Sequence, residues 1–91
     1  MSELTRYERY YSSSVPFPDE PIKVSYGHIS YERTSKTNQA NCGKHCESDD
    51  DCHGFVVITS DNGAKCHYKG ASADALREGR VDADAASTLW V

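Results

Sequence analysis

Four cysteines carry most of the chemistry that this sequence offers. Cys42, Cys46 and Cys52 lie in the stretch NCGKHCESDDDC, and Cys66 follows in AKCHYK. Thiols at such spacings can bind zinc, act as a nucleophile or form disulfides. Three of the four histidines directly adjoin these cysteines, which adds potential metal ligands. What the chain does depends on which of the three chemistries applies.

Zinc and thiol catalysis fit the spacing poorly. Structural zinc sites commonly take their four ligands as two close pairs. Cys42 and Cys46 form one such pair, but thirteen residues separate Cys52 from Cys66. A catalytic thiol needs a lowered pKa and a base beside it in space, which a sequence neighbour does not establish. We predict no catalytic residue, no metal and no cofactor, with a zinc site of four thiolates as the remaining alternative.

Disulfides suit a chain of this size. A domain of 91 residues, 37% of them hydrophobic, buries a thin core and is usually reinforced by disulfides or a metal. A Cys46–Cys52 bond would close a short loop through ESDDD. A Cys42–Cys66 bond would then tie a helix to a strand and stabilise the fold by roughly 3 kcal/mol.

A helix and a hairpin are expected to position these cysteines. Cys42 and Cys46 lie four residues apart, which places both on one face of a helix. The run GFVVIT (54–59) is apolar and β-branched, as in a strand. SDNG (60–63) is a hairpin-turn signal, and AKCHYK (64–69) is the returning strand.

The remaining elements are bounded by local signals. Candidate N-caps before the first helix are Ser35, Thr37 and Asn38. SADALREG predicts a second, short helix that begins after Ser72 and ends at Gly79. STLWV predicts a final strand.

The segment IKVSYGHISYER (22–33) alternates and predicts one bent strand or a hairpin. We expect Ile22, Val24 and Tyr26 to share one face, and Ile29 and Tyr31 to continue beyond Gly27. The predicted fold of residues 22–91 is α+β: a small disulfide-stapled domain with one main helix packed on a small antiparallel sheet.

Residues 1–21 predict an extended N-terminal arm. SSSVPFPDEP contains all three prolines, which interrupt regular structure. Before it, TRYERYY could form one or two helical turns, with Thr5 and Glu8 as a capping box. The aromatic residues of the arm are the predicted anchors for a protein partner: Tyr7, Tyr10, Tyr11 and Phe17.

Charge and hydropathy exclude several partners. The net charge of −4 disfavours nucleic acid, which needs a basic face. No apolar run approaches the roughly 20 residues of a membrane span, so no membrane insertion is expected. The first residues lack the apolar stretch of a signal peptide. Disulfides then imply either the mature part of an extracellular protein or oxidation by another route, as in a virion.

Two further features have ordinary explanations. Glu47 and the run Asp49–Asp51 lack the glycine and distal glutamate of a calcium-binding loop, so we predict a solvated acidic turn. Trp90, next to the C-terminal residue, is expected to be a core or interface aromatic.

Over about residues 22–91, the cysteine pattern resembles the core of PAN/apple domains. The order is Cys-x3-Cys, Cys-x-Gly-Phe, a strand, then Cys-x-Tyr. The matching residues are Cys42, Cys46, Cys52, Gly54, Phe55 and Cys66, with Tyr68 in place of the usual leucine. The family lays a helix bearing Cys-x3-Cys against a small antiparallel sheet. The resemblance implies the pairs Cys46–Cys52 and Cys42–Cys66, which loop geometry also favours.

This chain departs from the full apple pattern in two respects. It has no cysteines for the further disulfide that joins the termini, and residues 1–21 have no counterpart. The resemblance implies a binding module rather than an enzyme, because relatives bind proteins or carbohydrates. The missing signal peptide, the Pro-rich arm with its aromatic residues and the absence of predicted catalytic residues favour a minor structural component of an assembly, such as a virion or surface layer. The alternative is an extracellular adhesion or glycan-binding module.

Overall fold

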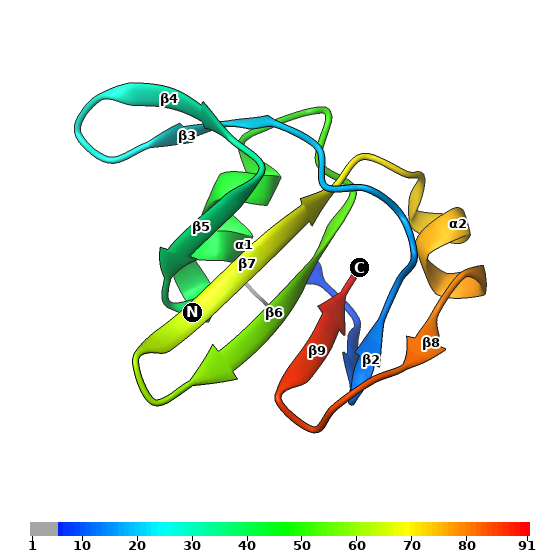
Figure 1. Ribbon diagram of the computed structural model, residues 1–91. Coiled ribbons are helices and arrows are strands. Elements are labelled where there is room, and N and C mark those ends of the chain that lie inside the picture. The colour runs from blue at the N-terminus through cyan, green and yellow to red at the C-terminus, as the bar shows by residue number, and fades with distance from the viewer. Residues whose placement is uncertain (1–5) are drawn as a thin grey trace.

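Strands dominate the part of the chain that the computed structural model describes, residues 6–91. Five strands form an antiparallel sheet in the order β1-β9-β6-β7-β5, and two further pairs are β2–β8 and β3–β4 (Figure 1). The elements are β1 Arg9–Tyr11, β2 Ser13–Ser14, β3 Ile22–Ser25, β4 Ile29–Glu32, β5 Thr34–Thr37, α1 Gln39–Glu47, β6 Gly54–Ser60, β7 Gly63–Lys69, α2 Ala73–Glu78, β8 Val81–Asp82 and β9 Ser87–Trp90.

Local signals set the bounds of both helices. The Asn38 side chain accepts a hydrogen bond from the Asn41 N–H at the start of α1. Ser72 does the same for the Ala75 N–H at the start of α2, and Gly79 is its C-cap. Such caps satisfy N–H groups that have no partner within the helix. The predicted caps at Asn38, Ser72 and Gly79 are confirmed.

The sheet is covered on both faces. Phe55 and Val57 of β6 face α1, whereas Val56 between them faces α2 and the N-terminal segment. This explains why GFVVIT is continuously apolar instead of alternating. The core on the α1 side contains Ile22, Val24, Cys42, Cys46, Cys52, Phe55, Val57, Cys66, Tyr68 and Trp90. The core on the other side contains Val15, Val56, Leu76, Leu89 and Val91.

The predicted fold class is correct only in outline. The protein is a small compact domain with two disulfides, two helices and a mostly antiparallel sheet. It is richer in sheet than one main helix on a small sheet implies, because two strands that the sequence did not indicate join the sheet. These are β1 from the N-terminal segment and β5, which contains the N-cap candidates Ser35 and Thr37. Within residues 6–91, neither helix is long and apolar enough to cross a membrane.

The N-terminal segment belongs to the sheet. β1 lies along β9, with Arg9 opposite Trp90. Glu8 and Val91 exchange two backbone hydrogen bonds, so the segment closes against the end of the chain. The helical turns expected over TRYERYY are wrong for Arg9–Tyr11, which form β1, although Arg6 has 3₁₀-helical geometry. The edge of β9 offers a partner to an aromatic segment of high strand propensity. Thr5 of the expected capping box lies outside the described residues.

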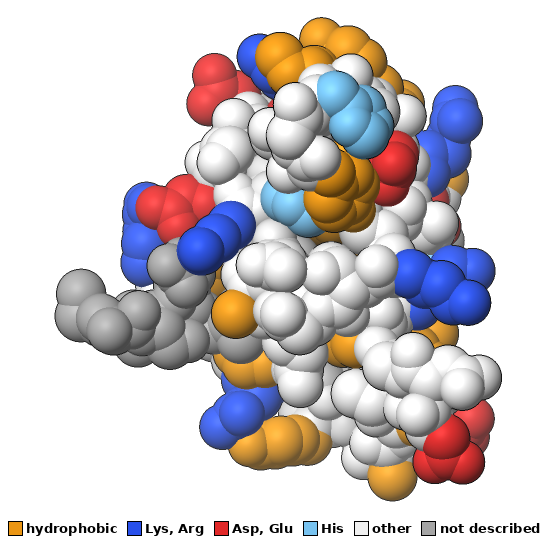
Figure 2. All heavy atoms as spheres, turned by 90° about the vertical axis from the view of Figure 1, so that its left-hand side faces the viewer, with side chains coloured by type: hydrophobic (Ala, Val, Ile, Leu, Met, Phe, Trp, Pro, Cys, Tyr) orange, Lys and Arg blue, Asp and Glu red, His pale blue; other side chains and the backbone are white. Residues whose placement is uncertain are grey.

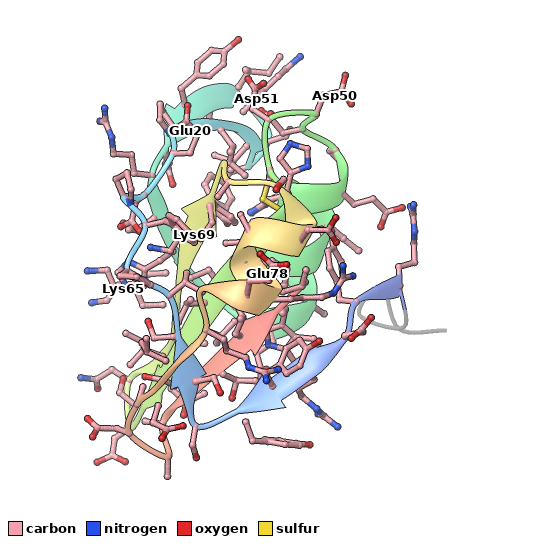
Figure 3. All side chains as sticks on the ribbon, turned by 90° about the vertical axis from the view of Figure 1, so that its right-hand side faces the viewer. Glu20, Asp50, Asp51, Lys65, Lys69 and Glu78 are labelled. Carbon is pink, nitrogen blue, oxygen red and sulfur yellow. A yellow bond between two sulfur atoms is a disulfide. The ribbon has the colours of Figure 1, made fainter. Side chains whose placement is uncertain are left out.

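The rest of this segment crosses the sheet and is held to β7. The Glu20 N–H donates to the Tyr68 carbonyl oxygen over 2.8 Å. The Lys69 ammonium group is buried and lies 2.6 Å from Asp19 Oδ1 and 2.8 Å from the Phe17 carbonyl oxygen. Figure 3 shows Lys69 on β7 beside the blue segment that leads to β3. Residues 6–21, predicted as an arm, therefore pack onto the domain.

Gly54 marks a close approach of β6 to its neighbours. A Cβ added there would lie 2.5 Å from Leu76 Cδ1 and 2.8 Å from the Trp90 carbonyl oxygen. We expect Gly54→Ala to lower the free energy of unfolding by about 1–3 kcal/mol, as overpacking does, and urea denaturation measures it. Gly70→Ala is the matched control, because its nearest neighbours are atoms of the flexible Glu20 side chain. Equal losses in both variants would contradict this interpretation.

Candidate functional site

The four cysteines form two disulfides that link α1 to its surroundings. Cys42 on α1 is bonded to Cys66 in the middle of β7, and Cys46, one turn later, is bonded to Cys52 before β6. Cys42, Cys46 and Cys66 are at most 1% exposed. The bonds therefore fix one face of the helix to the sheet, in the pairing that loop geometry favoured.

Because all four cysteines are paired in disulfides, none is available as the zinc ligand or catalytic thiol that the sequence analysis considered. All four cysteines lie in the described part of the chain and none is free, so no thiolate is present to bind zinc or attack a substrate. Two disulfides are typical of proteins that fold in an oxidising environment. Within residues 6–91, no cluster of three or more histidine, cysteine or acidic side chains is arranged to hold a metal ion.

The four predicted anchor residues have different surroundings. Tyr7 is half-buried, packs edge-on against Phe55 and directs its hydroxyl to the Gly43 carbonyl oxygen. Tyr10 and Phe17 pack against the core on the α2 side. Tyr11 is 66% exposed. Of the four, only Tyr11 exposes most of its side chain to solvent.

A second group of exposed apolar residues lies on the β3–β4 hairpin. Ile29 and Tyr31, here called the hairpin patch, are 61% and 72% exposed, whereas Tyr26 at the turn is 41% exposed and packs on His45. The hairpin projects from one end of the body (Figure 1). Figure 2 shows hydrophobic side chains gathered at the top of the molecule, over this hairpin, with a histidine beside them. Exposed apolar clusters of this kind are typical of binding surfaces.

Sequence reasoning missed this patch because it depends on strand register. The chain reverses at Gly27, whose φ is 85°. Ile22 then pairs with Glu32 and Val24 with Ser30, so these four share the face toward the body. Ile29 and Tyr31 must point outward, since successive residues of a strand alternate. In a single bent strand they could have continued the buried face.

A chain of polar groups connects the hairpin to the core. Tyr68 is fully buried, and its hydroxyl lies 3.0 Å from Nδ1 of His45 on α1. Burial raises the pKa of Tyr68 to about 12, against the opposing effect of a hydrogen bond with Ser35. Burial also lowers the pKa of His45, although Glu32 opposes this. His45 packs edge-to-face on Tyr26 at a centroid distance of 5.1 Å, so it lies between hairpin and core.

The acidic turn after α1 is exposed, but one carboxylate in it is structural. Asp50 and Asp51 are exposed (Figure 3). Asp49 Oδ1 accepts a hydrogen bond from the Asp51 N–H, and Oδ2 accepts one from the Lys23 N–H on β3. The turn therefore links the end of α1 to the β3–β4 hairpin.

A groove of about 470 Å³ lies between β3 and α1. One wall is the continuous run Lys23–Tyr26. The other wall is a single face of the helix, because its residues follow i, i+3, i+4, i+7 spacing. These are Asn41, Lys44, His45 and the C-cap residue Ser48. The groove is thus bounded by strand backbone on one side and by polar and basic helix side chains on the other.

Comparison with protein-family models, curated proteins and solved structures finds no match for this chain. Functional conclusions therefore rest on its own geometry.

Proposed function

We propose that this protein is a non-enzymatic protein-interaction module and a minor structural component of a larger assembly, such as a virion or a surface layer. The observation that carries the proposal is the exposed hairpin patch, which nothing in the described part of the chain covers. Burying the Ile29 and Tyr31 side chains in an interface supplies favourable free energy, and tyrosine is enriched among the energetically dominant contacts.

The rest of the domain is suited to presenting this patch. Two disulfides and a sheet covered on both faces hold the hairpin base in a fixed orientation. Because Tyr7, Tyr10 and Phe17 pack on the protein's own core, we assign the main partner contact to the hairpin patch, with Tyr11 as a second exposed aromatic. The two disulfides fit an extracellular or virion location.

The relation to PAN/apple domains remains part of the proposal. The observed cysteine pairing is the one that the resemblance implies, and loop geometry implies it too. In place of the terminal disulfide of full apple domains, this chain has β1 paired with β9.

The proposal is tested by replacing the hairpin patch in the assembled protein. We expect the double variant Ile29→Ser, Tyr31→Ser to keep its thermal unfolding midpoint, because both side chains are exposed. Its retention in purified virions or surface layers should fall at least tenfold, measured by quantitative immunoblot against the unmodified protein.

The matched control is Ile58→Ser, Val81→Ser, which removes two exposed apolar side chains elsewhere. The control should be retained normally. Normal retention of the hairpin variant would refute the assignment of the partner contact to the patch.

A further inference from the structure

The outer edge of β4 carries backbone groups that β3 does not use. The Tyr26 N–H donates to the His28 carbonyl oxygen inside the hairpin, so these two residues form a hydrogen-bonded pair. Hydrogen-bonded and non-hydrogen-bonded pairs alternate along an antiparallel ladder. Ser30 is therefore the next β4 residue that bonds to β3. Ile29 and Tyr31 lie between such pairs and direct their N–H and C=O groups away from β3.

The direction and the exposure of this edge follow from its surroundings. On β3, Lys23 is paired with Tyr31, and its N–H donates outward to the Asp49 carboxylate. Its opposite residue must also direct its backbone groups out of the hairpin. Among the described strands β4 pairs only with β3, and β3 is the strand that lies against α1. The edge of β4 is thus the outer margin of the projecting hairpin (Figure 1).

The β4 edge lacks the features that usually keep a strand edge from pairing. Natural edges often carry lysine, proline or a bulge. The two outer strands of the main sheet carry cations, Arg9 on β1 and Lys36 on β5. β4 reads ISYE, and its single charged side chain, Glu32, is half-buried and accepts hydrogen bonds from the Ser30 and Ser35 hydroxyls. Such an edge is suited to pairing with a further strand.

The β4 edge is complementary to a second copy of itself. When two β4 strands pair antiparallel about a two-fold axis at Ser30, Ile29 of each copy lies opposite Tyr31 of the other. All the outward backbone groups of these residues are then used. Their side chains meet on one face as pairs of a β-branched and an aromatic residue, which are favourable across strands. An axis at Tyr31 would instead need the Arg33 carbonyl oxygen, which already accepts the Tyr68 N–H.

Charge favours the same register. The run GHISY (27–31) contains no acidic residue, although the chain has a net charge of −4. Two copies can therefore meet along this run without opposing carboxylates. In this register Glu32 of each copy lies opposite His28 of the other, and an imidazole N–H can donate to a carboxylate. A register that places Glu32 opposite itself would bring like charges together, which destabilises a strand pair.

We propose that the partner of the hairpin patch is a second copy of this chain, joined by antiparallel pairing of the two β4 edges about a two-fold axis at Ser30. The two hairpins then form one sheet in the order β3-β4-β4-β3, with both hairpin patches merged on its outer face. A two-fold pair is the commonest closed arrangement of identical chains. The inference rests on the proposed function, because it takes the hairpin patch as the partner contact, and it adds the identity of that partner.

Self-association is measured by sedimentation equilibrium of the oxidised full-length protein at micromolar to millimolar concentrations. We expect a monomer–dimer equilibrium, because one strand pair makes a small interface, and small interfaces are typical of transient complexes. Ile29→Ser, Tyr31→Ser should weaken the dimer at least tenfold. The control Ile58→Ser, Val81→Ser, which removes exposed apolar side chains elsewhere, should change it less than twofold. A protein that stays monomeric throughout, or equal weakening by both variants, would overturn the proposal.

A cysteine at the two-fold axis tests the register. In a non-hydrogen-bonded antiparallel pair the Cα atoms lie about 4.5 Å apart, a separation that a disulfide can bridge. Ser30→Cys should therefore form a disulfide-linked dimer on mild oxidation. Ser25→Cys is the matched control on β3, because its two copies would lie about 14 Å apart at ~4.8 Å per strand and should stay unlinked. Equal linking of both variants, or no linking of Ser30→Cys, would refute the pairing.

These assays and the retention test can fail separately. If Ile29→Ser, Tyr31→Ser is lost from assemblies while the isolated protein stays monomeric and Ser30→Cys stays unlinked, the hairpin patch contacts a different protein and the second-copy inference is wrong. If Ser30→Cys links specifically but the hairpin variant is retained normally, the dimer stands and the assignment of the patch to an assembly contact is wrong.

Discussion

Replacing both Cys42 and Cys66 by alanine is expected to lower the free energy of unfolding by about 3 kcal/mol or more. The bond closes a sequence separation of 24 residues, for which restriction of the unfolded chain alone contributes about 3 kcal/mol. Both sulfurs also lie in the core on the α1 side, so their removal leaves a small cavity. This is a large part of the roughly 5–14 kcal/mol expected for a domain of this size, and loss of a native disulfide from a small domain often abolishes folding at 37 °C. We therefore expect the variant to be largely unfolded at that temperature.

The matched control is Cys46→Ala, Cys52→Ala. Its bond closes a separation of only 6 residues, for which the same model predicts about 2 kcal/mol. Urea denaturation under non-reducing conditions measures both variants. A larger loss in the control would show that the link between α1 and β7 is not the principal covalent stabiliser of the fold.

Replacing Asp19 by alanine is expected to lower the free energy of unfolding by roughly 2–3 kcal/mol. Asp19 binds the Lys69 ammonium group and lies 2.9 Å from His67 Nδ1. Removing it would leave the cation buried with only the Phe17 carbonyl oxygen. Breaking a buried ion pair commonly costs about 3–5 kcal/mol. We expect less here because the Asp19 side chain is 26% exposed.

A second replacement distinguishes an unpaired charge from a lost contact. In Asp19→Ala, Lys69→Met, no buried cation remains, and an apolar chain of similar length fills its place. We expect this double variant to recover most of the stability that Asp19→Ala loses. Additive losses, measured as a double-mutant cycle by urea denaturation, would show that the pair is not coupled.

The same pair gives the stability a defined pH dependence. Burial alone would raise the pKa of Asp19, but hydrogen bonds from Lys69 and His67 outweigh it and hold the pKa below its usual value. The folded state then binds fewer protons than the unfolded chain, whose Asp pKa is about 3.9. The stabilisation is fully present above about pH 5 and is lost as the pH falls below about 4, through the lowered pKa. The difference between the unmodified protein and Asp19→Asn should shrink over that acid range.

The sequence by itself determined the elements that depend on interactions between residues close together in the chain. Asn38 and Ser72 satisfy the first N–H groups of their own helices, and each acts within three residues. The β6–β7 hairpin follows from the apolar, β-branched strand GFVVIT and the turn signal SDNG, with Ser60 paired to Gly63. The spacing of Cys42 and Cys46 brought both onto the buried face of α1. These features were predictable because capping, turns and helical spacing involve neighbours in the chain.

Only the tertiary structure decided where segments distant in sequence meet. Arg9–Tyr11 joins β9 at the other end of the chain, and Asp19 meets Lys69. Nothing local to Arg9–Tyr11 specifies a strand partner; these residues form a strand because they pair with the edge of β9 and because Tyr10 packs against the core on the α2 side. The reversal at Gly27 likewise determines which face of β4 is exposed. Strand pairing and register depend on the whole packed core, so the hairpin patch and the groove beside it became visible only in three dimensions.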